Sequence, residues 1–463
     1  MAGIGFELRK LTARDDLLGI VQGYVHSALV STGPWLFTIL SLGAIVLYGS
    51  LVAPPQVLAD FRLIIIYNFA VSLVMSGPVV MVATRLLADM IYQKKVTEAP
   101  SLMLGSLLLL YGTQTLVVAP FYLFYVDFSW GTRLAALVSF FLITGIWLVS
   151  VFITALKDYQ AITRSFALGM LLGTGGAAAL AMNYSVAGML IGFSSGLAYI
   201  LFSLIGKIFA EYPYPVTHPF RFLGQFRRYW HIAAGGLLYN AAIWADKWVM
   251  WFSTNREVMP SGMVSYPDYD GAMFLAYLSI VPSMAAFVFQ VETDFFEKYV
   301  RFYREIQSRA TYARIQENHT AILQTILGGL RNLIVLQGSI CFVTVLLAPR
   351  IFEILGFSFV QLGMFRFGVM GAFFHVLLLV LTILLSYFDL RQETLAINSI
   401  FLVTNLCFTY ASMKMGFPYY GYGYFLSTLV TFLLSFLVAM HYTAQLPYQT
   451  FVRNNASLRE KPF

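Results

Sequence analysis

The sequence predicts an all-α polytopic membrane protein with twelve transmembrane helices in two halves of six. Hydrophobic residues make up 59% of the 463 residues and charged residues only 11%, whereas soluble domains carry roughly 25% charged residues. Twelve apolar runs are each close to the ~20 residues that cross a bilayer as a helix. The Pro-rich stretch 211–228 separates the first six runs from the last six. Since six is even, the two halves have the same orientation, as expected for parallel repeats.

The predicted spans follow one another with short connections. Their expected limits are 23–52, 62–88, 101–126, 134–157, 161–182, 186–209, 229–253, 271–291, 326–348, 364–388, 393–415 and 420–444. The first apolar run begins too late, and is too long, for a cleavable signal peptide, so we expect it to stay in the membrane.

The remaining segments complete the predicted organisation. An interfacial amphipathic helix is expected over 1–22 and a tail over 445–463. The two halves are expected at 23–210 and 229–444, joined by the linker 211–228. The second half includes an amphipathic arm at 293–325. A faint repeat accompanies the two halves, because Tyr24 and His26 open the first span as Tyr229 and His231 open the seventh, with an alanine two positions after each histidine.

The distribution of basic residues predicts which ends of the spans face the cytoplasm. With the N-terminus inside, the inner segments hold 22 of the 29 Lys and Arg residues, the outer segments hold six, and Lys247 lies within a span. Because cytoplasmic loops are enriched in Lys and Arg, both termini are predicted to be cytoplasmic. The net charge of +7 therefore reflects membrane topology and not nucleic-acid binding.

Asp246 and Lys247 are unusual because they stand in an otherwise apolar span, YNAAIWADKWVMWF at 239–252. A charged side chain within the bilayer costs ~2.5 to 3.5 kcal/mol on insertion scales, so one that is retained usually faces a wet cavity or a partner. Sequence neighbours point ~100° apart on a helix, so we expect the two side chains not to be simply a pair with each other.

Two interpretations of these charges stay open. Asn240, Trp244 and Trp251 share a helix face with Lys247, and with Asp246 they would line a polar substrate path. Alternatively, Lys247 lies about 27 Å along the span, where its stem can snorkel to the far interface among the tryptophans of an aromatic belt.

Gly-Pro pairs are expected to kink or break the first two spans. Gly33 and Pro34 precede Trp35 in the first span, and Gly77 and Pro78 lie in the second. Proline removes a hydrogen bond from the helix. Broken membrane helices are tolerated where they line a cavity, which places Trp35 among the predicted path residues, although an ordinary packed kink is the alternative.

His375 is also included in the predicted path. It lies in the tenth span, about 13 Å from Arg366, and is either a proton-responsive group or a histidine hydrogen-bonded within the bundle. Asp268 and Asp270 form a D-x-D, a spacing too common to indicate a metal-dependent glycosyltransferase, so we expect two solvated loop acids. Neither stretch shows the companions that a catalytic or metal site needs.

A basic amphipathic arm is predicted after the eighth span. Its apolar residues recur at helical spacing, and its other side carries charges that include Arg301, Arg304 and Arg309. Such an arm either rests on anionic lipid or docks a cytosolic partner.

Six stretches resemble those of a known family. They are MAGIGFEL at 1–8, STGPWLFT at 31–38, ATRLLAD at 83–89, NAAIWADKWVMWF at 240–252, VETDFFEKY at 291–299 and FFHVLLLVLTILLSYFDLR at 373–391. Together they resemble the PelG family, the inner-membrane exporters of the Pel exopolysaccharide system. The resemblance runs over essentially the whole chain, and its N-terminal and seventh-span segments are the specific ones.

The resemblance implies a fold similar to the polysaccharide flippases of the multidrug/oligosaccharidyl-lipid/polysaccharide (MOP) exporter superfamily. These have two six-helix bundles and an alternating-access cavity between them. It also implies a polymer rich in N-acetylgalactosamine and galactosamine, no catalytic site and no cofactor. The implied partners are the soluble glycosyltransferase PelF, the cyclic di-GMP receptor PelD and the membrane protein PelE.

We therefore expect a transporter, not an enzyme, that moves this polymer from cytoplasm to periplasm. Trp244 and Trp251 would stack on pyranose rings, while Lys247 and Asn240 would donate hydrogen bonds. The alternatives are a flippase of lipid-linked oligosaccharides, a drug antiporter of the same superfamily with Asp246 as its acid, and a membrane scaffold for the glycosyltransferase.

Overall fold

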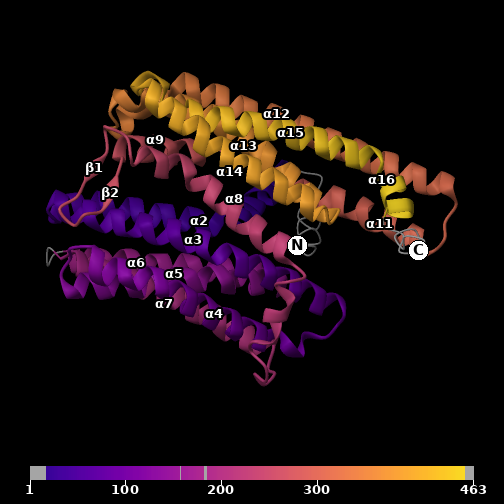
Figure 1. Cartoon of the computed structure of the whole chain (residues 1–463), viewed down its shortest axis with the longest axis horizontal. Helices are drawn as coiled ribbons and strands as arrows, with labels where there is room; N and C mark the ends of the chain where they lie inside the picture. The colour runs from indigo at the N-terminus through magenta and orange to yellow at the C-terminus, as the bar shows by residue number, and fades with distance from the viewer. Residues whose placement is uncertain (1–16, 157, 182–184, 454–463) are drawn as a thin grey trace, which may run out of the picture. The chain divides into compact units, whose positions relative to one another are not determined.

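The computed structural model describes residues 17 to 453 except 157 and 182–184, and it is built almost entirely of helices (Figure 1). Most of the interfacial helix predicted at 1–22 and the last ten residues of the predicted tail lie outside the described residues. Both remain predictions.

The chain divides into two compact units. We call residues Thr32–Pro267 the N unit, and the residues up to Ser31 together with those from Asp268 onward the C unit. The division falls within the first long helix, directly before Gly33 and Pro34. Each unit is described by itself.

The N unit is a bundle of long helices with a small hairpin. Its helices are α2 (Leu17–Val52, from Thr32), α3 (Pro55–Tyr92), α4 (Ala99–Pro120), α5 (Trp130–Leu156), α6 (Tyr159–Ala181), α7 (Val186–Glu211) and α8 (Trp230–Met250), with short turns η1 (Val96–Glu98), η2 (Phe121–Tyr125) and η3 (Arg221–Gln225). Strands β1 (Glu257–Val258) and β2 (Val264–Ser265) pair antiparallel, with Glu257 opposite Ser265.

The C unit contains the remaining elements. They are α9 (Pro267–Leu278), α10 (Val281–Gln290), η4 (Val291–Phe295), α11 (Phe296–Gln307), α12 (Tyr312–Leu355), η5 (Phe359–Gln361), α13 (Leu362–Tyr387), α14 (Arg391–Met415), η6 (Phe417–Tyr419), α15 (Tyr422–Ala444), α16 (Leu446–Tyr448) and η7 (Gln449–Arg453).

All twelve predicted spans coincide with helices, which confirms the all-α polytopic class. Among the described residues, nine helices are long and apolar enough to cross a membrane by themselves. Of the other predicted spans, the one in α2 contributes the shorter apolar helix Leu36–Val52, and those in α6 and α8 are helical without meeting the criterion. Twelve is therefore the number of helical segments that match the predicted spans, while nine meet the stricter criterion.

The eighth span is not the continuous helix that we predicted over 271–291. It is broken between α9 and α10 at Ser279 and Ile280, because Pro282 has no N–H to donate and its ring crowds the carbonyl of Leu278. The Ser279 hydroxyl donates to the Ala276 carbonyl over 2.7 Å, which satisfies one of the groups left at the break.

The Gly-Pro pairs do not break their helices. α2 continues through Pro34 and α3 continues through Pro78. In α3 a side-chain donor near the proline adds to the helix hydrogen bonds: Ser76 Oγ donates to the Ser72 carbonyl, six residues before Pro78, over 2.6 Å. Neighbouring donors of this kind allow a membrane helix to keep its course past a proline.

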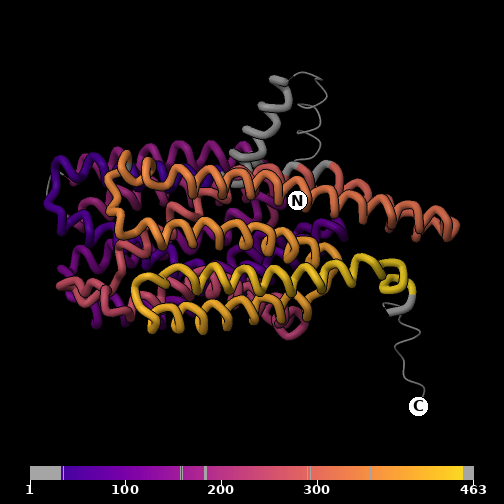
Figure 2. The backbone as a smooth tube through the Cα atoms, turned by 90° about the horizontal axis from the view of Figure 1, so that it is seen from above, coloured from indigo at the N-terminus to yellow at the C-terminus, as the bar shows by residue number. Residues whose placement is uncertain are grey.

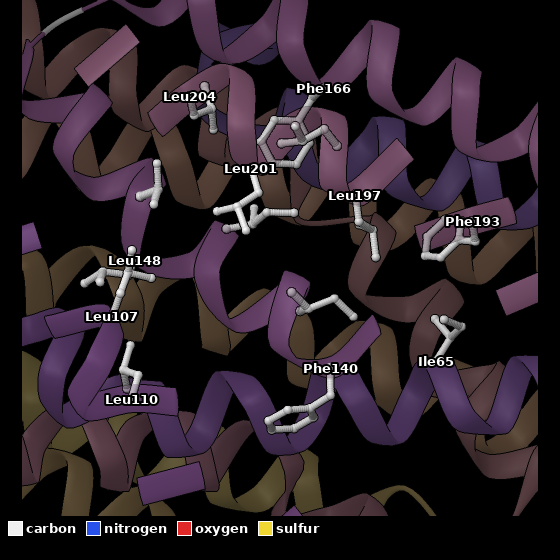
Figure 3. Packing of buried hydrophobic residues seen from close by; sticks show 14 of the residues in the cluster. Ile65, Leu107, Leu110, Phe140, Leu148, Phe166, Phe193, Leu197, Leu201 and Leu204 are labelled. Carbon is white, nitrogen blue, oxygen red and sulfur yellow. The ribbon is translucent and has the colours of Figure 1, made fainter. Parts of the chain in front are cut away.

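The hydrophobic core of the N unit is formed by α3 to α7, as Figure 3 shows for Ile65, Phe140 and Phe193. α6 and α7 approach closely along a stripe of glycines. A Cβ added to Gly196 would lie 2.1 Å from the Gly169 carbonyl oxygen, and one added to Gly192 would lie 2.3 Å from the Gly176 carbonyl carbon. Small residues permit such backbone contact, which drives helix association in membranes.

The linker 211–228 does not separate the two compact units. It packs on α4, where the Thr217 N–H donates to Ser101 Oγ over 3.1 Å, and a Cβ added to Gly105 would lie 1.6 Å from the Pro219 carbonyl oxygen. Arg221 pairs with Glu98 at 2.5 Å. The chain therefore returns to the N unit in α8, and the compact units divide at 267–268, not at the linker. The division of the sequence into two six-span halves remains a proposal.

Candidate functional site in helix α8

The charged pair lies near the C-terminal end of α8, inside the N unit. Asp246 is fully buried and Lys247 is 7% exposed. Lys247 Nζ lies 3.1 Å from Asp246 Oδ1 and 3.2 Å from Oδ2, so the two residues are an ion pair. The expectation that the two would not simply be a pair with each other is wrong, because the lysine side chain is long enough to fold around the helix to its neighbour.

The lysine amine is directed back along its own helix. Its Nζ donates to the Ile243 carbonyl over 3.2 Å and lies 5.8 Å from the centre of the Trp244 ring. This direction is opposite to the one that snorkelling to the far end of α8 requires. The contacts put three kinds of group around one cation: a carboxylate, a carbonyl and an aromatic face.

Asn240 does not face open space in this structure. Its Nδ2 donates to the Leu73 carbonyl of α3, five residues before Pro78, over 2.9 Å. Gly236 of α8 lies against Gly77 of α3, since a Cβ added to either residue would lie 2.9 Å from the carbonyl oxygen of the other. The Gly-Pro position therefore serves as the contact between α3 and α8, as in an ordinary packed kink.

Replacing Asn240 with leucine is expected to lower the free energy of unfolding of the N unit by about 1 to 2 kcal/mol, because the Leu73 carbonyl loses a buried donor. Thermal unfolding of the purified protein in detergent measures this change. Asn240→Gln, which keeps the donor, serves as the control, and equal stability of Asn240→Leu and the wild type would contradict the assigned bond.

Trp251 forms part of a stack of rings in the N unit and is only 7% exposed. It lies 4.8 Å from the centre of the Tyr67 ring at an interplanar angle of 10°, and Tyr67 in turn stacks on Phe121 at 5.9 Å. The Tyr67 hydroxyl donates to the Val264 carbonyl over 2.7 Å, so a hydrogen bond links strand β2 to α3. Trp251 therefore presents little free surface for a sugar, whereas Trp244 is half-buried.

Two predicted path residues, His375 and Trp35, remain to be located. His375 belongs to α13 of the C unit. The side chain of Trp35 lies outside the described residues, so its place on a path is untested.

His375 is hydrogen-bonded within its bundle. It is 4% exposed, and its Nδ1 lies 2.7 Å from the Tyr424 hydroxyl oxygen. The edges of its ring contact Tyr277 and Phe401 at centre distances of 5.7 and 5.3 Å. This environment matches the structural interpretation of the histidine.

Replacing Tyr424 with phenylalanine is expected to lower the stability of the C unit by about 1 to 3 kcal/mol, because the His375 ring nitrogen becomes a buried polar atom without this partner. Thermal unfolding monitors the loss, and export per folded molecule is expected to stay near the wild-type value. A selective loss of export at normal stability would instead place His375 on the transport path.

We expected the two D-x-D acids to be solvated loop residues, and the structure differs from this expectation. Asp268 is half-buried, and its Oδ1 accepts a hydrogen bond from Gln361 Nε2 over 2.6 Å. Both Asp268 and Asp270 lie in the first turn of α9, where negative charge is favoured by the helix dipole. Their position in this turn is therefore favourable for the stability of α9.

A second contact between α3 and α8 was missed by sequence reasoning. Asp89 pairs with Arg85 of the same helix at 3.4 Å, and it also accepts a hydrogen bond from the Tyr229 hydroxyl over 2.9 Å. Tyr229 and Asp89 are 140 positions apart, so no local pattern indicated the contact. Together with Asn240 and Gly236, it holds α8 along α3.

The comparison with protein families identifies the chain. The model of the family described as "PelG: Putative exopolysaccharide Exporter (EPS-E)" matches residues 1–451. The chain belongs to the PelG family. No curated protein matches it.

Solved structures similar to this PelG family member are transporters of the MOP superfamily. One is a MOP superfamily transporter from Pyrococcus furiosus, with 14% identity and a TM-score of 0.61 over 91% of this chain and 96% of that chain. Another is a MATE protein in the straight conformation, with 14% identity and a TM-score of 0.62 over 92% of this chain and 96% of that chain. A third is the inward-facing form of a multidrug resistance MATE family transporter, with 15% identity and a TM-score of 0.62 over 91% and 99%.

These likenesses extend over the whole fold and confirm the MOP-type architecture. Because the identities are near 15%, they show the fold alone. With the family match, they indicate a multi-pass membrane transporter and not an enzyme.

Proposed function

We propose that this protein exports the Pel polysaccharide, a polymer rich in N-acetylgalactosamine and galactosamine, from the cytoplasm to the periplasm across the bacterial inner membrane. The observation that carries the proposal is the match of the exopolysaccharide exporter family over residues 1–451. The excess of Lys and Arg in the predicted inner segments supports cytoplasmic termini.

The buried pair Asp246 and Lys247 is the proposed polar element of the path. Replacing a buried ion pair with apolar residues of similar size is often neutral or stabilising, so stability alone does not explain why α8 carries two charges. Hydroxyl and acetamido groups of a sugar polymer can accept from the ammonium and donate to the carboxylate. We propose that the pair opens toward the polymer during transport, with the half-buried Trp244 beside it as a stacking surface.

The proposed partners follow from the family. A PelF-type glycosyltransferase would supply the growing polymer at the cytoplasmic face, and PelD-type and PelE-type membrane proteins would assemble with the exporter. An exporter of this kind needs an enzyme that makes the polymer on the side from which it is exported.

Inverted membrane vesicles test the proposal directly. Vesicles containing the protein, given the transferase and a labelled sugar nucleotide, are expected to accumulate labelled polymer in the lumen, protected from added glycosidase. Vesicles lacking the protein are the control. Polymer that is made but remains outside the lumen would favour the scaffold alternative, and efflux of cationic dyes without polymer uptake would favour a drug antiporter.

A further inference from the structure

The arm predicted after the eighth span is a helical hairpin, which we call the prong and define as residues 296–325. α11 and the first part of α12 form its two sides. The apolar side of α11 is covered by protein: Phe302 is fully buried, the Tyr299 hydroxyl donates to the Tyr387 carbonyl over 2.9 Å, and the rings of Phe295 and Tyr387 lie 5.3 Å apart. The prong therefore has no apolar face left to insert into lipid.

The tip of the prong lies far from the membrane boundary. Thr325 and Gly329 of α12 line a small apolar cavity together with Tyr387 at the end of α13. These three residues therefore lie at the same level of the C unit. The paired charges of Asp389 and Arg391, 2.8 Å apart, follow directly, and we infer from them that this level is the edge of the hydrocarbon. Figure 2 shows α11 and the start of α12 extending past the ends of α13 and α14.

Helix geometry gives the height of the tip. Tyr312 lies about 20 Å farther along the α12 axis than Thr325, at ~1.5 Å per residue. The head-group layer accounts for about 5 to 8 Å of this, and charge interactions in solution are screened beyond about 8 Å at physiological salt. With the α12 axis along the membrane normal, Tyr312 is therefore beyond the reach of anionic head groups.

The tip is basic and carries an exposed aromatic ring. Arg304, Arg309 and Arg314 are exposed there, and Tyr312 is 70% exposed. Arg314 pairs with Glu305 at 3.0 Å. In the part of the chain that the structure describes, no acidic partner is found for Arg304 or Arg309.

The conformation of Arg309 is also unusual for its residue type. Its φ is +56°, a left-handed value that favours glycine, and its N–H caps α11 by donating to the Ile306 carbonyl over 3.1 Å. An arginine is present where glycine would fit the backbone better. The conformation of the turn therefore does not explain why residue 309 carries a positive charge.

We propose that the tip of the prong binds an acidic surface on a cytosolic protein. Tyrosine and arginine are the residues enriched in protein interfaces and in their energetic centres, and a basic tip selects an acidic partner by charge. The cytoplasmic location of the tip rests on the topology in the proposed function, whereas the binding chemistry does not depend on the polymer.

Photo-crosslinking in cells tests this inference on the full chain. p-Benzoylphenylalanine placed at Tyr312 is expected to give an adduct to a cytosolic protein, and mass spectrometry of the joined peptide is expected to show a surface rich in Asp and Glu. The same probe at Tyr410, a 54% exposed position on the span α14, is the control and is expected to give lipid adducts. Phospholipid adducts at Tyr312 would overturn the inference.

The variant Arg309→Gly distinguishes an effect on partner binding from an effect on the stability of the fold. Glycine suits the left-handed turn, so this variant is expected to be at least as stable as the wild type, while the yield of the Tyr312 adduct falls about threefold to tenfold. Arg309→Lys, which keeps the charge, is expected to retain most of the adduct. An undiminished adduct in Arg309→Gly would contradict the proposed role of the charge.

A defined probe gives the same information without cells. The purified protein in nanodiscs of zwitterionic lipid is expected to bind fluorescent poly-L-glutamate in a salt-dependent way, with a Kd raised about threefold to tenfold by Arg309→Gly. Equal binding by both proteins would count against the tip. Neither readout involves polymer export, so the failure of this inference and that of the proposed function are distinguishable.

Discussion

Replacing Lys247 with methionine is expected to destabilise the N unit by about 3 to 5 kcal/mol, the usual effect of removing one partner from a buried ion pair. Asp246 is fully buried, and the ammonium 3.1 Å from its Oδ1 compensates its charge. Without that ammonium the carboxylate must either stay charged in a site of low polarity or take up a proton. Chemical or thermal unfolding of the purified protein in detergent measures the loss.

The double variant Asp246→Asn with Lys247→Met is the matched control for this prediction. Removing both charges leaves no uncompensated ion, so most of the lost stability is expected to return. A double variant as unstable as Lys247→Met alone would show that the two residues act independently, and that the ion pair is not what holds this part of α8.

Replacing Gly236 with valine is expected to lower the stability of the N unit by about 2 to 4 kcal/mol, or to prevent folding. A Cβ at this position would lie 2.9 Å from the Gly77 carbonyl oxygen and 2.6 Å from Met81 Cγ, so α8 must move away from α3. The separation adds the loss of the Asn240 hydrogen bond to the ordinary strain of overpacking. Thermal unfolding and the yield of monodisperse protein report the effect.

Gly112→Val provides the control for Gly236→Val. Gly112 lies in α4, with nothing within 4 Å of an added Cβ, so valine there tests the same change of residue in a helix without a close neighbour. Similar losses in the two variants would show that the helix propensity of valine, and not the contact between α3 and α8, determines the result.

The spans were accessible to sequence reasoning because each is encoded locally, by a run of apolar residues of the right length. The break in the eighth span was missed because Pro282 lies within such a run, and hydropathy does not register a missing N–H. The docking of the linker 211–228 was also missed. It depends on Gly105 of α4, more than a hundred positions away, and no periodicity within the linker indicates it.

The candidate site was located from sequence for a different reason: Asp246 and Lys247 are charges where charges are costly. Their surroundings were not accessible in the same way. Asn240 and Trp251 share the helix face of Lys247, as helix geometry predicts. Both of them contact α3, because Asn240 donates to the Leu73 carbonyl and Trp251 stacks on Tyr67. A helix face shows which residues lie together, whereas only the packed structure shows whether they meet a neighbouring helix or a substrate.

The central claim of this account is that the charges of α8 act on the polymer and not only on the fold. The most direct test is the rate of polymer entry into inverted vesicles containing the variant Asp246→Asn with Lys247→Gln, divided by the amount of folded protein. We expect a loss of at least about tenfold, the effect of about 1.4 kcal/mol, at near wild-type stability. A rate equal to that of the wild type would contradict the claim.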